Sequence, residues 1–182
     1  MLFLKNNIKK NFFYLFIIFF LIFIFIVFFR GLNKENVYVP SEIFNSEIIN
    51  FSSKELFTNE EIIFKELLSE NKFTILNIWA SWCLPCRSEH KYLMQLSNNK
   101  DLNIIGLNYK DKIQNAKNFI DDFGNPYSVV LVDSDGTKSI ELGAYGVPET
   151  YIINNEEKKF LKKYIGPIDQ YKFNEIKKII LK

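Results

Sequence analysis

The sequence predicts an α/β domain with a mixed sheet flanked by helices, behind one N-terminal transmembrane helix. Residues 12–29 form an unbroken apolar run, which is long enough as a helix to cross a bilayer. Beyond residue 51, strand-like and helix-like segments alternate, and the last two strand-like segments form a hairpin before a closing helix. Strand–helix alternation is typical of a parallel α/β sheet, and the hairpin adds antiparallel strands to it.

The apolar run is predicted to be an uncleaved membrane anchor. Phe12 to Phe29 contains 18 residues, nine of them Phe, and shows no polar face. A cleaved signal peptide is the alternative, but the run is long for one and no small-x-small cleavage site follows Arg30. Lysines 5, 9 and 10 precede the run, which favours a cytoplasmic N-terminus at residues 1–11 and a domain on the far side.

The remaining chain divides into a tether and one domain. Residues 30–50 are polar and irregular and are predicted to be a tether, and residues 51–182 are predicted to fold. Apolar periodicity predicts helices over 59–69, 83–96, 111–123 and 169–181. Runs of β-forming residues, bounded by turn residues, predict strands over 73–79, 102–109, 127–132, 151–153 and 159–165.

Composition excludes several classes of protein. Two Cys and one His cannot complete a four-ligand zinc site without carboxylates, and they allow one disulfide at most. The first thirty residues hold four basic and no acidic residues, which leaves 19 basic and 21 acidic residues for the remaining 152. The folded part is therefore weakly acidic, and neither a metal nor a nucleic-acid partner is expected.

The two cysteines are spaced as Cys83-Leu84-Pro85-Cys86, directly after a predicted strand. At the start of a helix the two thiols can close a disulfide, and the first lies where backbone N–H groups and the helix dipole stabilise a thiolate. Cys83 is therefore predicted to be the nucleophile at the exposed end of the helix, and Cys86 the thiol that resolves the mixed disulfide. No cofactor beyond this redox-active disulfide is expected.

Other uses of the cysteine pair are weaker. A metal site would need a second pair, and haem attachment would need His where Arg87 stands. A purely structural disulfide across so short a loop removes little chain entropy. A copper-binding delivery module stays open as an alternative of another class, with His90 or Met94 as the added ligand.

A second motif, Gly146-Val147-Pro148-Glu149-Thr150, precedes the predicted strand over 151–153. A proline here can be an ordinary edge or turn residue. Beside a Cys-x-x-Cys pair it is instead predicted to form a cis-proline loop packed against the dithiol. The Val147 backbone would then face an incoming extended peptide and bind it by strand-like hydrogen bonds.

Three further residues are given supporting roles. Trp82 adjoins the first cysteine and is predicted to form part of the docking surface. Glu89 lies three residues after Cys86 and shares its helix face, while Glu149 follows the proline of the second motif; either could take the proton of the inner thiol or bind a partner. The alternatives are a solvated helix face for Glu89 and an ordinary surface acid for Glu149.

Residues 77–87 resemble the active-site stretch of membrane-anchored thioredoxin-like proteins. Four further pieces narrow the resemblance: Glu89-His90, and residues 106–111 (GLNYKD), 124–127 (GNPY) and 143–150 (GAYGVPET). Together they are similar to the thiol:disulfide interchange proteins of cytochrome c maturation, the CcmG/DsbE family, from about residue 40 to the C-terminus. The resemblance implies a thioredoxin-like fold.

The resemblance also implies a single-pass protein of the bacterial inner membrane, held there by residues 12–29, with its C-terminal domain in the periplasm. Such a protein keeps the haem-attachment cysteines of apocytochrome c reduced and is recharged by a membrane thiol carrier. Asn77 stands where general thioredoxins carry a buried Asp that accepts the inner thiol's proton, which an Asn cannot do. A general periplasmic reductase of other client proteins is the alternative within the same class.

Overall fold

The structure, a computed structural model, describes residues 2–32, 48–68 and 71–181. It comprises two units, Met1–Tyr38 and Val39–Lys182, which are described separately. The N-terminal unit holds one helix, α1 (Leu2–Leu32), and its residues Phe12–Gly31 have a mean hydropathy of 3.2. By length and composition this helix can cross a membrane. The predicted tether over 30–50 lies mostly outside the described residues.

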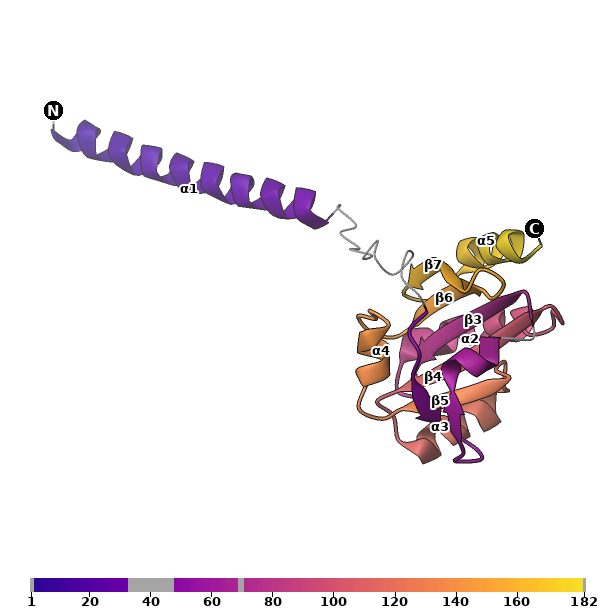
Figure 1. The fold of residues 1–182 in the computed structure, drawn as a ribbon. Helices are drawn as coiled ribbons and strands as arrows, with labels where there is room; N and C mark the ends of the chain where they lie inside the picture. The colour runs from indigo at the N-terminus through magenta and orange to yellow at the C-terminus, as the bar shows by residue number, and fades with distance from the viewer. Residues whose placement is uncertain (1, 33–47, 69–70, 182) are drawn as a thin grey trace. The chain divides into compact units, whose positions relative to one another are not determined.

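The second unit is built on a five-stranded sheet in the order β5-β4-β3-β6-β7 (Figure 1). The strands span Phe73–Trp79 (β3), Leu102–Tyr109 (β4), Val129–Asp133 (β5), Glu149–Asn154 (β6) and Lys159–Ile165 (β7). β3 pairs in parallel with β4, and β4 with β5, whereas β3 pairs antiparallel with β6 and β6 with β7. The mixed α/β sheet predicted from the sequence is confirmed.

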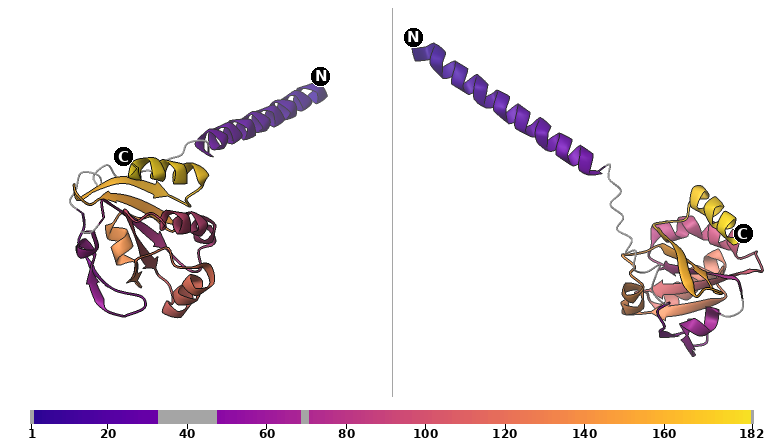
Figure 2. Two further views of the ribbon diagram at one scale, coloured as in Figure 1. Left: turned by 90° about the vertical axis from the view of Figure 1, so that its right-hand side faces the viewer. Right: turned by 45° about the horizontal axis from the view of Figure 1, so that its top comes forward.

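Helices cover both faces of the sheet, because its central strand is apolar on both sides. Ile75 and Trp79 of β3 join a core with α2 (Leu84–Leu96), α3 (Ile113–Phe123) and α5 (Gln170–Ile180). Leu76 and Ile78 point the other way, into a core with the 3₁₀ helix η2 (Phe64–Leu68) and the residue after α4 (Thr137–Glu141). Figure 2 shows α5 and α2 on the same side of the sheet.

The helix predicted over 59–69 is wrong. Asn59 has a positive φ of 61°, and the Glu55 carboxylate accepts hydrogen bonds from the N–H groups of Phe57 and Thr58, so the chain turns here. It then forms β2 (Glu61–Ile63), which pairs antiparallel with β1 (Ser52–Lys54), and continues into η2. These short strands and the five-residue helix α4 were not predicted, since each is too short to show a periodic pattern.

Candidate active site

The two cysteines lie where β3 passes into α2. Cys83 is the N-cap residue of α2 with extended backbone angles, and Pro85 occupies the first turn. A disulfide joins Cys83 to Cys86, and the Cys86 N–H donates a hydrogen bond of 3.1 Å to the Cys83 sulfur. An N–H group at the helix N-terminus therefore points at the sulfur that was predicted to be the nucleophile, where it would stabilise a thiolate.

The surface around the disulfide is formed by its neighbours in the chain. Cys83 is only 3% exposed, whereas Trp82 and Leu84 are 58% and 75% exposed. The expectation that Cys83 lies at an exposed helix end is therefore wrong for this disulfide-bonded form. Cys83 itself is buried, and the exposed side chains are those of its two neighbours in the sequence. The exposed Trp82 agrees with its predicted place on a docking surface.

The second motif lies beside the dithiol in space. The Val147–Pro148 peptide bond is cis, as expected. β6 begins directly afterwards, and its Glu149 pairs with Ile78, the penultimate residue of β3. Val147 packs against the core that contains both cysteines. This register places the cis-proline loop next to the C-terminal end of β3, where the redox loop begins.

Glu89 is buried and lies in a network of polar groups. Its side chain is 1% exposed, and its two oxygens accept hydrogen bonds from Asn77 Nδ2 at 2.9 Å and from the Ile168 N–H at 2.8 Å. Burial raises the pKa of this carboxyl to about 7, against the lowering effects of these hydrogen bonds and of Lys172. The solvated helix face is therefore excluded for Glu89.

Asn77 holds this acid in place from the central strand. Its Nδ2 donates to Glu89 and also to Thr150 Oγ1 at 3.0 Å, while its Oδ1 accepts from the Tyr127 hydroxyl at 2.8 Å. Burial, and then the charge of Glu89, raises the pKa of Tyr127 well above its ordinary value, so the phenol stays a donor. The sequence pointed to Asn77 and Glu89 separately, but Tyr127, fifty residues further along the chain, was not connected with them.

Glu149 is also buried but has a cationic partner. Its Oε2 lies 2.8 Å from Lys163 Nζ, and both side chains are at most 1% exposed. Its Oε1 accepts hydrogen bonds from the N–H groups of Tyr145 and Gly146, and Lys163 also donates to the Gly143 carbonyl. Glu149 is therefore not an ordinary surface acid, and its carboxylate holds the loop that precedes the cis-proline.

His90 and Met94, the residues considered as added copper ligands, are engaged in other contacts. His90 Nε2 lies 2.9 Å from the Gly124 carbonyl, and its ring packs against Phe119 and Phe123. Burial lowers the pKa of His90. A Cβ added at Gly124 would lie 3.0 Å from the Met94 methyl group, so Met94 packs at the same place. Both side chains serve the contact between α2 and the end of α3.

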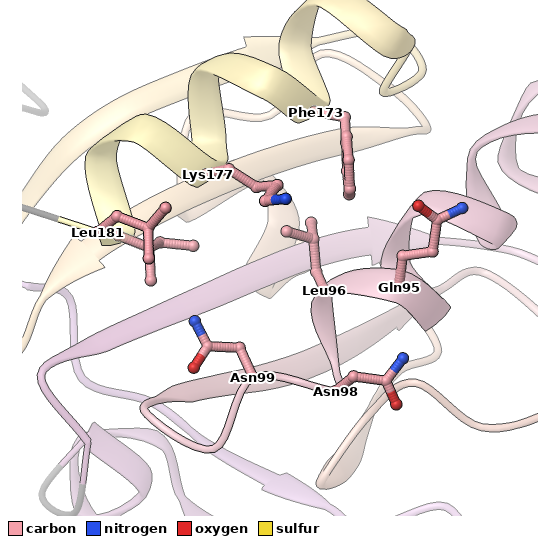
Figure 3. Close-up of a pocket in the computed structure, with 8 residues that line it drawn as sticks. Gln95, Leu96, Asn98, Asn99, Phe173, Lys177 and Leu181 are labelled. Atoms are coloured by element: carbon pink, nitrogen blue, oxygen red, sulfur yellow. The ribbon is translucent and has the colours of Figure 1, made fainter.

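A pocket of about 220 Å³ lies between the C-terminal end of α2 and α5, lined by Gln95, Leu96, Phe173 and Lys177 among others (Figure 3). Gln95 is twelve residues beyond Cys83, which corresponds to about 18 Å along a helix. The pocket therefore lies at the far end of α2 from the disulfide, and it takes no part in the candidate active site.

The comparisons with known proteins agree with this geometry. Residues 52–180 match the Redoxin family model. The chain is 34% identical to the thiol:disulfide interchange protein DsbE-2 of Pasteurella multocida over 165 residues, which cover 91% of this chain and 86% of that protein. It is 45% identical to DsbE of Escherichia coli over 89 residues, 49% of this chain and 48% of that one.

Solved structures share the fold. A thiol:disulfide interchange protein of Chlorobium tepidum superposes with a TM-score of 0.61 at 22% identity, over 75% of this chain and 97% of that chain. The matched stretch spans about half the length of Escherichia coli DsbE and likewise of CycY of Rhizobium leguminosarum.

A thioredoxin-like sheet with a Cys-x-x-Cys disulfide at a helix N-terminus and a cis-proline beside it defines the class of thiol-disulfide oxidoreductases. The chain belongs to the Redoxin family and, within it, to the DsbE-like thiol:disulfide interchange proteins.

Proposed function

We propose that the chain is a membrane-anchored reductase that keeps the haem-attachment cysteines of apocytochrome c reduced, with Cys83 as nucleophile and Cys86 as resolving thiol. The observation that carries the chemistry is the Cys83–Cys86 disulfide at the start of α2, with the buried acid Glu89 one turn beyond Cys86. The link to cytochrome c rests on similarity to DsbE proteins and on the family motifs.

The reaction starts from the reduced dithiol. The Cys83 thiolate attacks one sulfur of a client disulfide, and the other client sulfur leaves as a thiolate and takes up a proton. Cys86 then loses its proton and attacks the Cys83 sulfur, which breaks the mixed disulfide and releases the second client thiol. The client gains two electrons and two protons, and the protein is left as the disulfide seen in the structure. A membrane thiol carrier returns the two electrons.

Glu89 is proposed to accept the Cys86 proton. A carboxyl with a pKa of about 7 is close to half-ionised at neutral pH, so it can take up a proton and release it again. Glu89 shares a helix face with Cys86 at a spacing of three residues. Glu149, the other acid considered for this task, has its two oxygens engaged by Lys163 and by the loop N–H groups.

Trapping the client tests the function. A Cys86→Ala variant leaves the mixed disulfide unresolved, so it should accumulate covalently with an oxidised apocytochrome c peptide. Cys83→Ala should form no adduct. Equal trapping of unrelated disulfide proteins would favour the general reductase, and adducts through Cys86 in the Cys83→Ala variant would reverse the assignment of the two thiols.

The anchor and its topology are tested separately. Residues 12–29 are proposed to stay in the mature chain, with the dithiol in the periplasm. A reporter enzyme that is active only outside the cytoplasm should be active when it is fused after residue 40, and the mature protein should sediment with membranes. A mature N-terminus near Asn33 would overturn the anchor.

A further inference from the structure

One carboxylate, that of Asp111, holds the segment between β3 and the dithiol. Asp111 lies in the β4–α3 loop. Its Oδ2 accepts a hydrogen bond from the Ser81 N–H at 2.5 Å, and its Oδ1 accepts one from the Ser81 hydroxyl at 2.9 Å. Ser81 is 8% exposed and lies two residues before Cys83. Both the backbone and the side chain of Ser81 are therefore fixed by Asp111.

Asp111 is itself held by the end of β4 and by the residue that follows it in the chain. Its Oδ2 also accepts from Asn108 Nδ2 at 3.1 Å, and its Oδ1 from the Lys112 N–H at 2.8 Å. Each carboxylate oxygen thus has two donors: one is Ser81 in the redox loop, and the other is Asn108 near the end of β4 for Oδ2 and Lys112 for Oδ1. The side chain has little freedom to rotate without breaking several charge-assisted hydrogen bonds.

The next residue of the redox loop is held by the same loop. The Trp82 indole N–H donates to the Lys110 carbonyl at 3.1 Å. Lys110 adopts a left-handed φ of 44°, and its N–H donates to the Asp133 carbonyl at 2.9 Å, at the end of β5. Ser81 and Trp82 are therefore both attached to residues 110–111, immediately before the nucleophile.

We infer that Asp111 is a positioning residue for the redox reaction: through Ser81 it holds the loop that presents Cys83 at the N-terminus of α2. Asp111 acts on the loop and not on the reacting sulfurs. Without it, the loop spends less time in the geometry in which the Cys83 sulfur can meet a client disulfide in line. This inference rests on the roles proposed above for Cys83 and Cys86.

Two substitutions at Asp111 separate geometry from charge. In Asp111→Asn, the amide oxygen can still accept from the Ser81 N–H and Asn108, and the amide N–H can donate to the Ser81 hydroxyl, so both contacts to Ser81 are kept. Only the Lys112 N–H loses its acceptor. Asp111→Ala removes all of these hydrogen bonds. Both variants remove the same charge. If position is what Asp111 supplies, Asn should restore most of what Ala loses.

The measurement is kcat/KM for reduction of a peptide disulfide, together with the pH profile of Cys83 alkylation. The kcat/KM of Asp111→Ala is expected to fall by about 10-fold or more, and that of Asp111→Asn to stay within about 3-fold of the wild-type value. The alkylation profile should move in Asp111→Ala by more than in Asp111→Asn. Asp121→Ala, which removes an exposed acid from α3, is the matched control and should be unchanged.

Ser81→Ala provides a second route should Asp111→Ala fail to fold. This substitution removes the hydroxyl donor and keeps the hydrogen bond from the backbone N–H, so kcat/KM should fall by about 2- to 5-fold. The inference is overturned if Asp111→Asn falls as far as Asp111→Ala, or if neither Asp111→Ala nor Ser81→Ala slows reduction. Failure of the proposed function would be seen differently: Cys83→Ser would then reduce the peptide disulfide at the wild-type rate.

Discussion

Two buried glutamates lie near the redox site, and they differ in their partners. Glu89 is held by the neutral donors of Asn77 and Ile168, whereas Glu149 contacts the ammonium group of Lys163. Both side chains are 1% exposed. Burial without a contacting cation makes an acid that titrates near neutral pH. Burial with one makes an ion pair, which here fixes a loop.

The difference assigns the two acids to different tasks. An acid that changes protonation near pH 7 can exchange a proton with a thiol, and Glu89 lies on the helix of the dithiol. A carboxylate in a buried ion pair has a structural task, because removing its charge would leave a buried ammonium group unpaired. Glu149 is consequently suited to holding residues 143–146 next to the cis-proline.

Breaking the ion pair should give the largest effect. Lys163→Met keeps the length of the side chain but leaves the Glu149 carboxylate buried without its cation, so the free energy of unfolding should fall by about 3–5 kcal/mol. Urea denaturation measures it. Lys162→Met is the matched control, because its pair with Glu175 is about a third exposed and should contribute at most about 1 kcal/mol. Equal losses in the two variants would contradict the distinction.

Glu89→Gln should change the pH dependence of stability. The carboxyl has an ordinary pKa of 4.5 in the unfolded chain and about 7 when folded. The contribution of Glu89 to the free energy of unfolding is fully present below about pH 4.5 and is lost as the pH rises through 7. The free energy of unfolding of the wild type should fall by about 3 kcal/mol over this range. Gln cannot titrate, so the variant should gain about 3 kcal/mol relative to the wild type between pH 4.5 and 8.

The control for this measurement is Gln114→Ala, since Gln114 is exposed and carries no titratable group. Its difference from the wild type should not vary with pH over the same range. A pH-independent difference for Glu89→Gln as well would show that Glu89 does not titrate near neutrality, and it would remove the basis for its role as proton acceptor.

The smallest expected effect concerns two tyrosines, one at each glutamate. Tyr127→Phe removes the hydroxyl that donates to Asn77, and Tyr151→Phe removes the one that donates to the Leu142 carbonyl at 2.9 Å. Each should cost about 1–2 kcal/mol of stability. Only Tyr127→Phe should alter the pH profile of client reduction, because only Tyr127 supports the Asn77–Glu89 contact. A similar change in Tyr151→Phe would argue against two separate tasks.

The sequence was sufficient where a segment carries a strong local pattern. β3 and β4 were predicted with their observed bounds, because continuous runs of β-forming residues have few other uses in a core. The dithiol was found because a Cys-x-x-Cys pair combines two reactive groups with helix geometry. The β1–β2 hairpin was missed, since its three-residue strands hold polar residues such as Ser52 and Lys54.

The polar contacts of the site could not be predicted from the sequence, for a different reason. Lys163 looks like one of several surface lysines, and only the β6–β7 register, in which Tyr151 pairs with Lys163, brings it to Glu149. The available signal was an acid two residues before one strand of the predicted hairpin and a lysine on the other strand. The contact between Asp111 and Ser81 depends on how two loops meet at one sheet edge, and no periodic pattern records that.

The two tryptophans of the chain lie in opposite environments. Trp79 is 1% exposed and its ring is stacked with that of Tyr127, while Trp82 is 58% exposed and adjoins Cys83 in the chain. Indole fluorescence depends on solvent contact, and a neighbouring disulfide quenches it. The protein thus has two intrinsic optical reporters, one in the core that contains the disulfide and one at the surface beside it. A Trp82→Phe chain would keep the buried indole of Trp79, and difference spectra against it would isolate the signal of the exposed Trp82 without any added dye.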